Sequence, residues 1–189
     1  MICEYVSDVQ SWEPWQREYR YGVILIYPPE PLRSTVNALR ARHDPRSQAA
    51  CDAHVSLTLP LAREPGEADW RQLQGIAARA RPVTVRYGPL RHYLPHPGVC
   101  LTIEPQRELD QLRAALESAD IFGGCPPRKF PFSAHMTIAE FISVDETTQL
   151  MAQIGASVPR GEFLCTALSY AVPDSTFRFH EGALLSLGR

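Results

Sequence analysis

The stretch GVILIYPPEPLRSTVNALRARHDP, residues 22–45, contains one complete unit of the pattern that decides the fold. Its aliphatic run at 22–27 predicts a buried strand, which the prolines at 28 and 29 end. Pro31 suits the first turn of a helix, and apolar residues then recur at positions 32, 36 and 39. The unit is therefore a strand followed by an amphipathic helix of about three turns, which Asp44-Pro45 is expected to stop.

The same order of elements continues along the chain and then begins again. Proline and glycine punctuate almost every boundary, as expected for short strands and helices joined by turns. The first half continues with strands at 54–59 and 83–87, the latter closed by Gly88-Pro89, and a helix at 70–80. The second half has strands at 99–103, 135–138 and 164–172, with helices at 109–116 and 150–154; residues 177–187 form a final strand or hairpin.

This repeated pattern predicts an α+β fold made of two duplicated β-α-β-α-β lobes. We expect two antiparallel-type sheets that face a central cleft, within a single bilobal domain over residues 1–189. Lobe 1 covers about residues 20–93 together with the C-terminal strand region, and lobe 2 covers about 99–172. The first twenty residues show no clear period and stay unassigned, including Trp12 and Trp15.

Composition places this chain of 189 residues among globular proteins, with 44% hydrophobic and 21% charged residues. A net charge of −2 gives no basic footprint for a DNA duplex. The five cysteines are odd in number and form no C-x-x-C pair, so neither a disulfide framework nor a zinc finger is expected. No signal peptide or stretch of about 18 apolar residues is visible. We expect a cytoplasmic monomer without a membrane partner or a bound metal.

Two tetrapeptides carry the chemistry: HVSL at 54–57 and HMTI at 135–138. Their histidines are 81 residues apart, about one repeat, and both tetrapeptides fall in the second strand of their half. Because alternate side chains share a face of a strand, each histidine points the same way as the hydroxyl residue two positions later. The aliphatic residues between them point into the core, which leaves the polar faces to line the cleft.

Two imidazoles across a cleft suit paired proton transfer. Histidine titrates near pH 6.5, so one ring can be neutral and take a proton while the other is charged and gives one. A hydroxyl on the same face can donate a hydrogen bond to a phosphate oxygen as negative charge develops there. Either histidine alone is more simply read as a half-buried strand residue, whereas both together in matched repeats favour function.

These tetrapeptides resemble the two H-x-[ST]-h motifs, with h a hydrophobic residue, of the two-histidine (2H) phosphoesterase superfamily. The chain is most similar to the branch of RNA 2′,3′-cyclic phosphodiesterases and 2′–5′ RNA ligases. The flank FSAHMTIA at 132–139 is similar to that family's F-x-P-H-x-T-[IL]-A, except that Ala134 stands in the usual proline position. The stretch from Gly88-Pro89 to residues 99–105 also fits, and the likeness covers roughly residues 20–187.

The resemblance implies a bilobal α+β fold and metal-independent hydrolysis of a 2′,3′-cyclic phosphate or a 2′–5′ phosphodiester, without a cofactor. By motif matching, His54 and His135 form the acid/base pair, and Ser56 and Thr137 bind the phosphate. The implied partners are RNA ends or nucleotide cyclic phosphates. Ala134 puts the geometry of its loop in question and leaves the histidine pair unaffected.

Two further residues, Phe132 and Arg128, are weaker candidates for substrate binding. Phe132 can stack on a base, although phenylalanine beside a strand is more often part of the core. Arg128 can meet a phosphate, and a solvated loop charge is an equal alternative. The spacing of His92 and His96 suits a metal only on a helix, which the neighbouring prolines disfavour.

Two other functions stay open at this stage. A protein of this fold can hold RNA ends or nucleotides without turnover, or act on a cyclic phosphoester that is not RNA. The loops at 88–98 and 120–134 are expected to set the substrate. Which histidine is the base, whether the product carries a 2′- or a 3′-phosphate and whether ligation occurs are not decided by these patterns.

Overall fold

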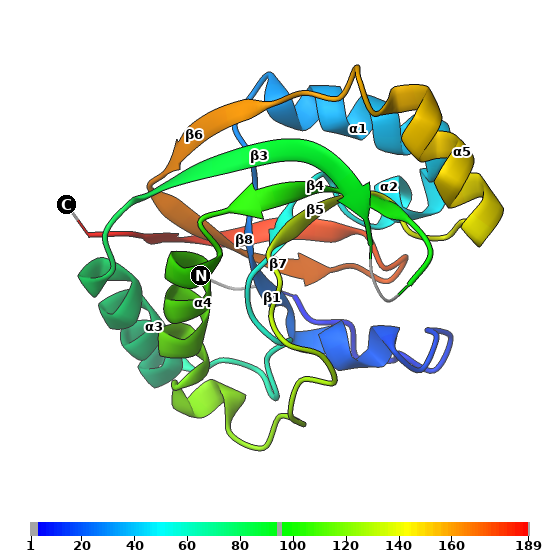
Figure 1. Ribbon diagram of the computed structural model, residues 1–189. Coiled ribbons are helices and arrows are strands. Elements are labelled where there is room, and N and C mark those ends of the chain that lie inside the picture. Colours follow the sequence, from blue (N-terminus) through cyan, green and yellow to red (C-terminus); the bar gives the residue numbers. More distant parts are fainter. Residues whose placement is uncertain (1–3, 94–95, 189) are drawn as a thin grey trace.

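One curled sheet of eight strands organises the computed structural model, which describes residues 4–93 and 96–188 (Figure 1). The strand order across the sheet is β6-β3-β4-β5-β2-β1-β7-β8, and all the pairings are antiparallel. The strands are β1 (Val23–Ile26), β2 (Val55–Ser56), β3 (Val83–His92), β4 (Val99–Glu104), β5 (His135–Ala139), β6 (Gly161–Cys165), β7 (Ala167–Pro173) and β8 (Phe179–Ser186).

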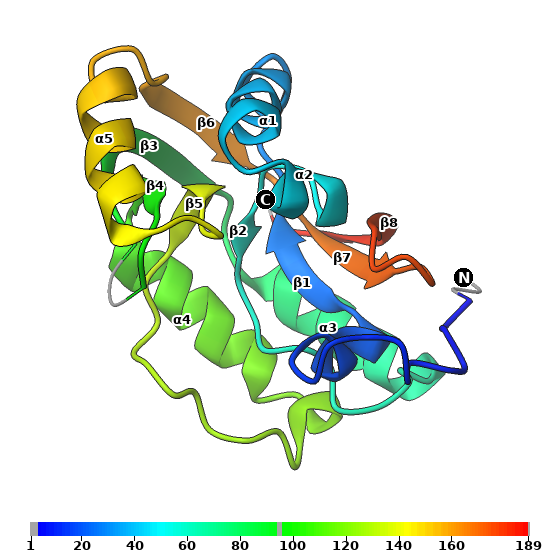
Figure 2. The same ribbon diagram turned by 90° about the vertical axis from the view of Figure 1, so that its right-hand side faces the viewer.

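The main hydrophobic core lies between one face of this sheet and four helices. Alternation along the strands places Ile24, Val55 and Met136 in this core. In two perpendicular views, α1 and α5 lie at one end of the molecule and α3 and α4 at the other (Figures 1 and 2). The helices are α1 (Leu32–His43), α2 (Pro45–Ala50), α3 (Glu67–Arg79), α4 (Gln106–Glu117) and α5 (Val144–Ile154), with 3₁₀ turns η1 (Gln16–Tyr21) and η2 (Asp120–Phe122).

The α+β class and most of the expected elements are confirmed. The opening unit, for example, forms β1 and α1, and the helix ends at His43, one residue before Asp44. Asp44 does more than stop that helix. Its side chain accepts a hydrogen bond from the Ser47 backbone N–H and so caps a second helix, α2, which the sequence analysis did not predict.

The expectation of two separate sheets is wrong, because hydrogen bonds run across all eight strands of the described chain. The two halves are joined where β2 pairs with β5, at a single registered pair, Val55 and Met136. Strand β3 comes from the first half of the sequence but pairs with β4 and β6. Strands β7 and β8 come from the end of the chain and lie beside β1. Each half therefore exchanges strands with the other.

Three strands differ from expectation for local reasons. The strand expected at 54–59 is much shorter: β2 covers only Val55–Ser56, and the backbone N–H groups of Leu57 and Thr58 both donate to the Ile24 carbonyl. Residues 164–172 belong to two strands, because the extended segment is interrupted at Thr166. Strand β6 ends before this residue, at one edge of the sheet, and β7 begins after it, beside β1. Strand β3 does not close at Gly88-Pro89 but continues to His92 through a bulge between Tyr87 and Leu90. A bulge absorbs the proline, which cannot donate to the ladder.

No helix in the described part of the chain combines the length and the apolar composition needed to cross a membrane. The four cysteines within residues 4–93 and 96–188 are free thiols, three of them buried.

Candidate active site

The two motif strands lie side by side, so the two histidines reach the same face of the sheet. Val55 pairs with Met136, and one step along each antiparallel strand places Ser56 opposite His135 and His54 opposite Thr137. Val55 and Met136 are completely buried on the core side. The four polar side chains therefore point to the opposite face, as the alternation in the sequence predicts.

Each imidazole is oriented in the same way by its own strand. His54 Nδ1 lies 2.7 Å from the carbonyl oxygen of Asp52, and His135 Nδ1 lies 2.6 Å from that of Ser133. A carbonyl oxygen only accepts hydrogen bonds, so Nδ1 carries the proton in both rings. The Nε2 atom of each neutral ring is then an unprotonated base that can exchange a proton with a ligand.

Burial keeps both rings neutral in the free protein. It lowers the pKa of His54 from 6.5 to about 4, with a smaller contribution from the positive charge of Arg40. The pKa of His135 is also lowered, first by burial and then by Arg91 and by His54 itself. A ligand that brings negative charge between the rings acts in the opposite direction and favours protonation of one of them.

A cavity of about 570 Å³ holds all four motif residues. Its volume falls within the range usual for small-molecule sites. Both polar and aromatic side chains line it: Trp15, Tyr19, Arg40, Ser47, Cys51, His54, Ser56, Tyr93, His96, His135, Thr137, Glu140, Phe141, Phe177 and Phe179 among others. The structure thus brings His54, Ser56, His135 and Thr137 together in one cavity.

A buried arginine, which the sequence analysis missed, supports this site from behind. Arg40 on α1 is only 2% exposed. It donates hydrogen bonds to the backbone carbonyls of Thr137, Ser47 and Cys51, at 2.8, 2.8 and 3.0 Å. Its charge is balanced by Asp44 and Glu140 nearby. The residue occupies an apolar position of the helical repeat, and a charged residue at a core position was the available signal.

Aromatic rings around the cavity were also missed. Tyr93 packs on His135 with ring centroids 4.6 Å apart, and His96 lies between Tyr93 and Phe130 at 6.1 and 5.7 Å. Tyr93 and His96 belong to the loop at 88–98 that the sequence analysis singled out for substrate choice. The part of that loop at 94–95 lies outside the described residues.

The two weaker candidates, Phe132 and Arg128, line a groove that adjoins the cavity and shares Ser56 and His135 with it. Arg128 donates to Glu117 at 2.6 Å and to the Leu57 carbonyl at 3.1 Å, and its guanidinium packs over the Phe132 ring. Both residues are thus held by protein contacts. A separate hollow of about 630 Å³ between α3 and α4 has no histidine in its lining.

Two further polar residues, His180 and Thr58, and the departure at Ala134 have structural explanations. His180 pairs with Asp174 at 2.8 Å, and Thr58 is buried, where its hydroxyl accepts from the Ile24 N–H. Ala134 is buried at the position where the family has proline, and its N–H donates to Gln106 Oε1 at 2.9 Å. Proline has no N–H, so a proline at this position could not make this hydrogen bond. Within residues 4–93 and 96–188, no group of three metal-ligating side chains is found.

Comparison with known proteins gives consistent results. Residues 28–176 match the sequence model of the 2′-5′ RNA ligase superfamily. A protein of Oceanobacillus iheyensis named "Putative phosphoesterase OB1230" is 26% identical over 143 residues, which are 71% of this chain and 78% of that protein.

Solved structures with the same fold include E. coli LigT complexed with 3′-AMP. It is 20% identical, with a TM-score of 0.59 over 88% of this chain and 97% of that one. The protein TT0787 of Thermus thermophilus is 17% identical, with a TM-score of 0.59 over 88% and 98%. E. coli LigT has also been solved with ATP, with a TM-score of 0.57 at 19% identity over 88% and 97%.

Proposed function

The chain belongs to the 2′-5′ RNA ligase superfamily, and on that premise we propose that it cleaves a phosphodiester of RNA or of a nucleotide. The favoured substrate is a 2′,3′-cyclic phosphate, with a 2′–5′ link as the related case. One observation carries the proposal: His54 and His135 share a cavity, and each is oriented through Nδ1 so that Nε2 is free for proton transfer.

The reaction needs one proton removed and one delivered. The neutral ring takes a proton from water through Nε2, and the water oxygen forms a bond to phosphorus. The P–O bond to the 2′ or the 3′ oxygen of the ribose breaks, and the protonated ring gives its proton to that oxygen. The product is a phosphomonoester, and the two rings end with their roles exchanged. Each role typically contributes ~10²–10⁴ in rate.

The phosphate itself supplies the difference between the two rings. Burial holds both neutral in the free protein, and a bound phosphodiester monoanion raises the pKa of each. A single negative charge stabilises the first imidazolium, and the positive charge of that ring then disfavours protonation of the second. One ring is therefore charged while the other stays neutral.

The hydroxyls of Ser56 and Thr137 are placed to hold the phosphate oxygens. Their strands put each hydroxyl next to the histidine of the other motif. Hydrogen bonds fixed in advance at the point where charge develops are worth far more than the same bonds in water. The buried guanidinium of Arg40, bonded to the Thr137 carbonyl, adds a positive charge behind that residue.

A metal has no role in these steps, since the acid, the base and the phosphate donors are all side chains. We therefore expect activity in excess chelator. The predicted monomeric state and cytoplasmic location stay predictions.

The proposal is tested by turnover of a panel of nucleoside 2′,3′-cyclic phosphates in EDTA. Wild-type protein is compared with the His54→Asn/His135→Asn double variant and with His180→Ala, whose histidine lies outside the cavity. Turnover by wild type and His180→Ala but not by the double variant supports the proposal. Binding of the nucleotides without turnover favours a non-catalytic module, and loss of activity in EDTA contradicts the metal-free scheme.

A further inference from the structure

Four aromatic residues, here called the aromatic wall, line the cavity, and two of them come from the N-terminal segment at residues 4–21. Trp15 and Tyr19 of this segment meet Phe177 and Phe179 near the start of β8. Ring centroids lie 5.3 Å apart for Trp15 and Phe177, 6.2 Å for Tyr19 and Phe177, and 5.8 Å for Tyr19 and Phe179. Each of these contacts is edge to face, and all four rings line the cavity that holds the histidines.

This wall is held in place at a cost to the backbone. Phe177 has a positive φ of 63°, the left-handed region that a bulky residue seldom adopts. Its ring is nevertheless buried, 6% exposed, and contacts Trp12 and Trp15 as well. The Trp12 indole N–H donates to the Ser175 carbonyl at 3.2 Å. Strain that neighbouring contacts impose in this way is typical of sites with a function.

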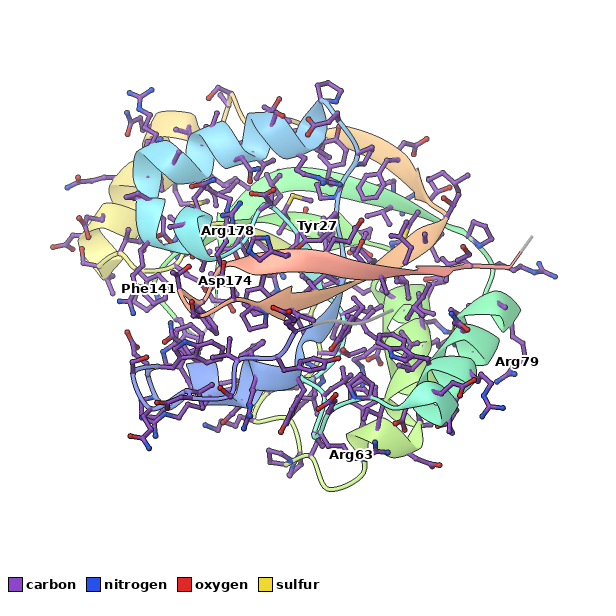
Figure 3. All side chains as sticks on the ribbon, turned by 180° about the vertical axis from the view of Figure 1, so that it is seen from behind. Tyr27, Arg63, Arg79, Phe141, Asp174 and Arg178 are labelled. Atoms are coloured by element: carbon purple, nitrogen blue, oxygen red, sulfur yellow. The ribbon has the colours of Figure 1, made fainter. Side chains whose placement is uncertain are left out.

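Trp15 is the exposed member of the wall, with 42% of its surface open to solvent. Its indole N–H donates to Glu13 at 2.7 Å, and the same carboxylate pairs with Arg46. The Arg46 guanidinium in turn lies over the Phe141 ring, 4.1 Å from the centroid. A chain of contacts thus runs from the N-terminal segment to Phe141, which lines the cavity and is labelled in Figure 3.

The occupant of this side of the cavity is indicated by its lining. Glu140 also lines the cavity, but its carboxylate accepts from the Ser47 hydroxyl and its charge is balanced by the buried Arg40. The flat face of a ring would meet the aromatic side chains of the wall. By contrast, Arg91, Arg128 and Lys129 line the adjoining groove. The aromatic side therefore suits a base.

We propose that the N-terminal segment is a specificity element and that Trp15 stacks on the base of the nucleoside whose phosphate reacts. The substrate class is then a phosphodiester whose scissile phosphate belongs to a nucleoside, not a cyclic phosphate on a plain polyol. This deepens the proposed function and rests on it. The family match begins at residue 28, so this element lies outside the matched region.

The first experiment compares kcat/KM for adenosine 2′,3′-cyclic phosphate with that for glycerol 1,2-cyclic phosphate, which has no aromatic base to stack. In Trp15→Ala, the ratio of the two values should fall by about 5- to 100-fold, the range for loss of one stacking partner. Trp15→Phe should restore most of the ratio. Leu164→Ala removes another exposed apolar side chain, on β6 and outside the cavity, and should leave the ratio unchanged. An unchanged ratio in Trp15→Ala overturns the proposal.

The second experiment separates stacking from catalysis, so that the two proposals can fail independently. Tryptophan fluorescence is titrated with adenosine 3′-monophosphate and with inorganic phosphate. The nucleotide should quench wild-type fluorescence, phosphate should not, and Trp15→Phe should abolish the quenching while Trp70→Phe retains it. Quenching without turnover of any cyclic phosphate would overturn the proposed reaction alone. Equal quenching in wild type and Trp15→Phe would overturn the role of Trp15 even if turnover is observed.

Discussion

Val55 on β2 stands directly opposite Met136 on β5, and this one pair joins the two halves of the sheet. Because the strands are antiparallel, the residues on either side of this pair face each other crosswise. The histidine of each motif therefore lies beside the hydroxyl residue of the other motif. Cross-strand neighbours in an antiparallel pair have Cβ atoms about 5 Å apart. The site is thus approximately two-fold, which is a natural geometry for a reaction that removes a proton on one side of phosphorus and delivers one on the other.

The first prediction concerns the two histidines. His54→Asn and His135→Asn should each lower kcat by about 10²–10⁴, because the asparagine amide can still bond the i−2 carbonyl but cannot transfer a proton. The double variant should lose little more than the worse single variant, since the two rings act as one unit. Multiplicative losses measured by steady-state kinetics would contradict a concerted pair.

The pH dependence of the rate follows from the lowered pKa values. The reaction needs one charged and one neutral ring, but burial lowers the pKa of both rings below 6.5 in the free protein, that of His54 to about 4. We therefore expect kcat/KM to decrease already as pH rises through these lowered pKa values, below 6.5, because the charged ring then loses its proton. The alkaline limb of kcat should lie at higher pH, because bound phosphate raises both pKa values. The same alkaline pKa in the pH profiles of kcat and kcat/KM would contradict this.

The same pKa shift predicts a pH effect on stability. His54 protonates near pH 6.5 when unfolded but at about 4 when folded. The contribution of neutral His54 to the free energy of unfolding is therefore complete above pH 6.5 and is lost as pH falls toward 4. The loss is at most about 3 kcal/mol, at 1.36 kcal/mol per pKa unit. Denaturant unfolding of wild type and His54→Asn at pH 7 and pH 4.5 measures this. Wild type should lose more stability between the two, and equal losses would contradict the shift.

The hydroxyls are predicted to act on the transition state. Ser56→Ala and Thr137→Val should each lower kcat by about 10²-fold with a small change in KM. Thr58→Val is the matched control on the same stretch of chain, because its hydroxyl bonds the Ile24 N–H. That variant should lose about 1–3 kcal/mol of stability by leaving a buried N–H unpaired, and should keep its kcat. A Thr58→Val variant with reduced kcat but intact stability would reverse this assignment.

Arg40 is predicted to matter for stability before anything else. Arg40→Met removes three hydrogen bonds to backbone carbonyls and leaves Asp44 and Glu140 without their nearby cation. We expect a loss of about 3–5 kcal/mol in the free energy of unfolding. Arg46→Met, which breaks an exposed ion pair with Glu13, should cost no more than about 1 kcal/mol. Similar losses of stability in the two variants would show that the hydrogen bonds of Arg40 do not hold α1, α2 and β5 together.

Local patterns in the sequence were sufficient for most individual elements. The period of 2 around His54 and His135 predicted their strands and the face that each side chain would take. The period of 3.6 predicted α1, α3, α4 and α5. These features depend on the burial of apolar side chains by a neighbouring layer, whichever layer that is, so they can be read from a few consecutive residues.

Strand partners could not be read in this way. The run at 164–172 looks like one strand, yet Thr166 divides it between β6 at one edge of the sheet and β7 beside β1. Pairing energy depends on residues distant in the chain, and many pairings satisfy the same alternation. The exchange of β3 and β7 between the halves was invisible for the same reason.

The sequence by itself therefore determined the elements of this protein, the faces of its motif strands and the residue types available for the chemistry. Only the tertiary structure decided that the two strands adjoin at Val55 and Met136, that Arg40 is buried behind them and that Trp15 lines the cavity. The physical reason is the distance along the sequence over which each interaction acts. Periodicity and turn chemistry act over a few residues, whereas strand pairing, burial of a charge and the lining of a cavity arise from segments that meet only after the chain has folded.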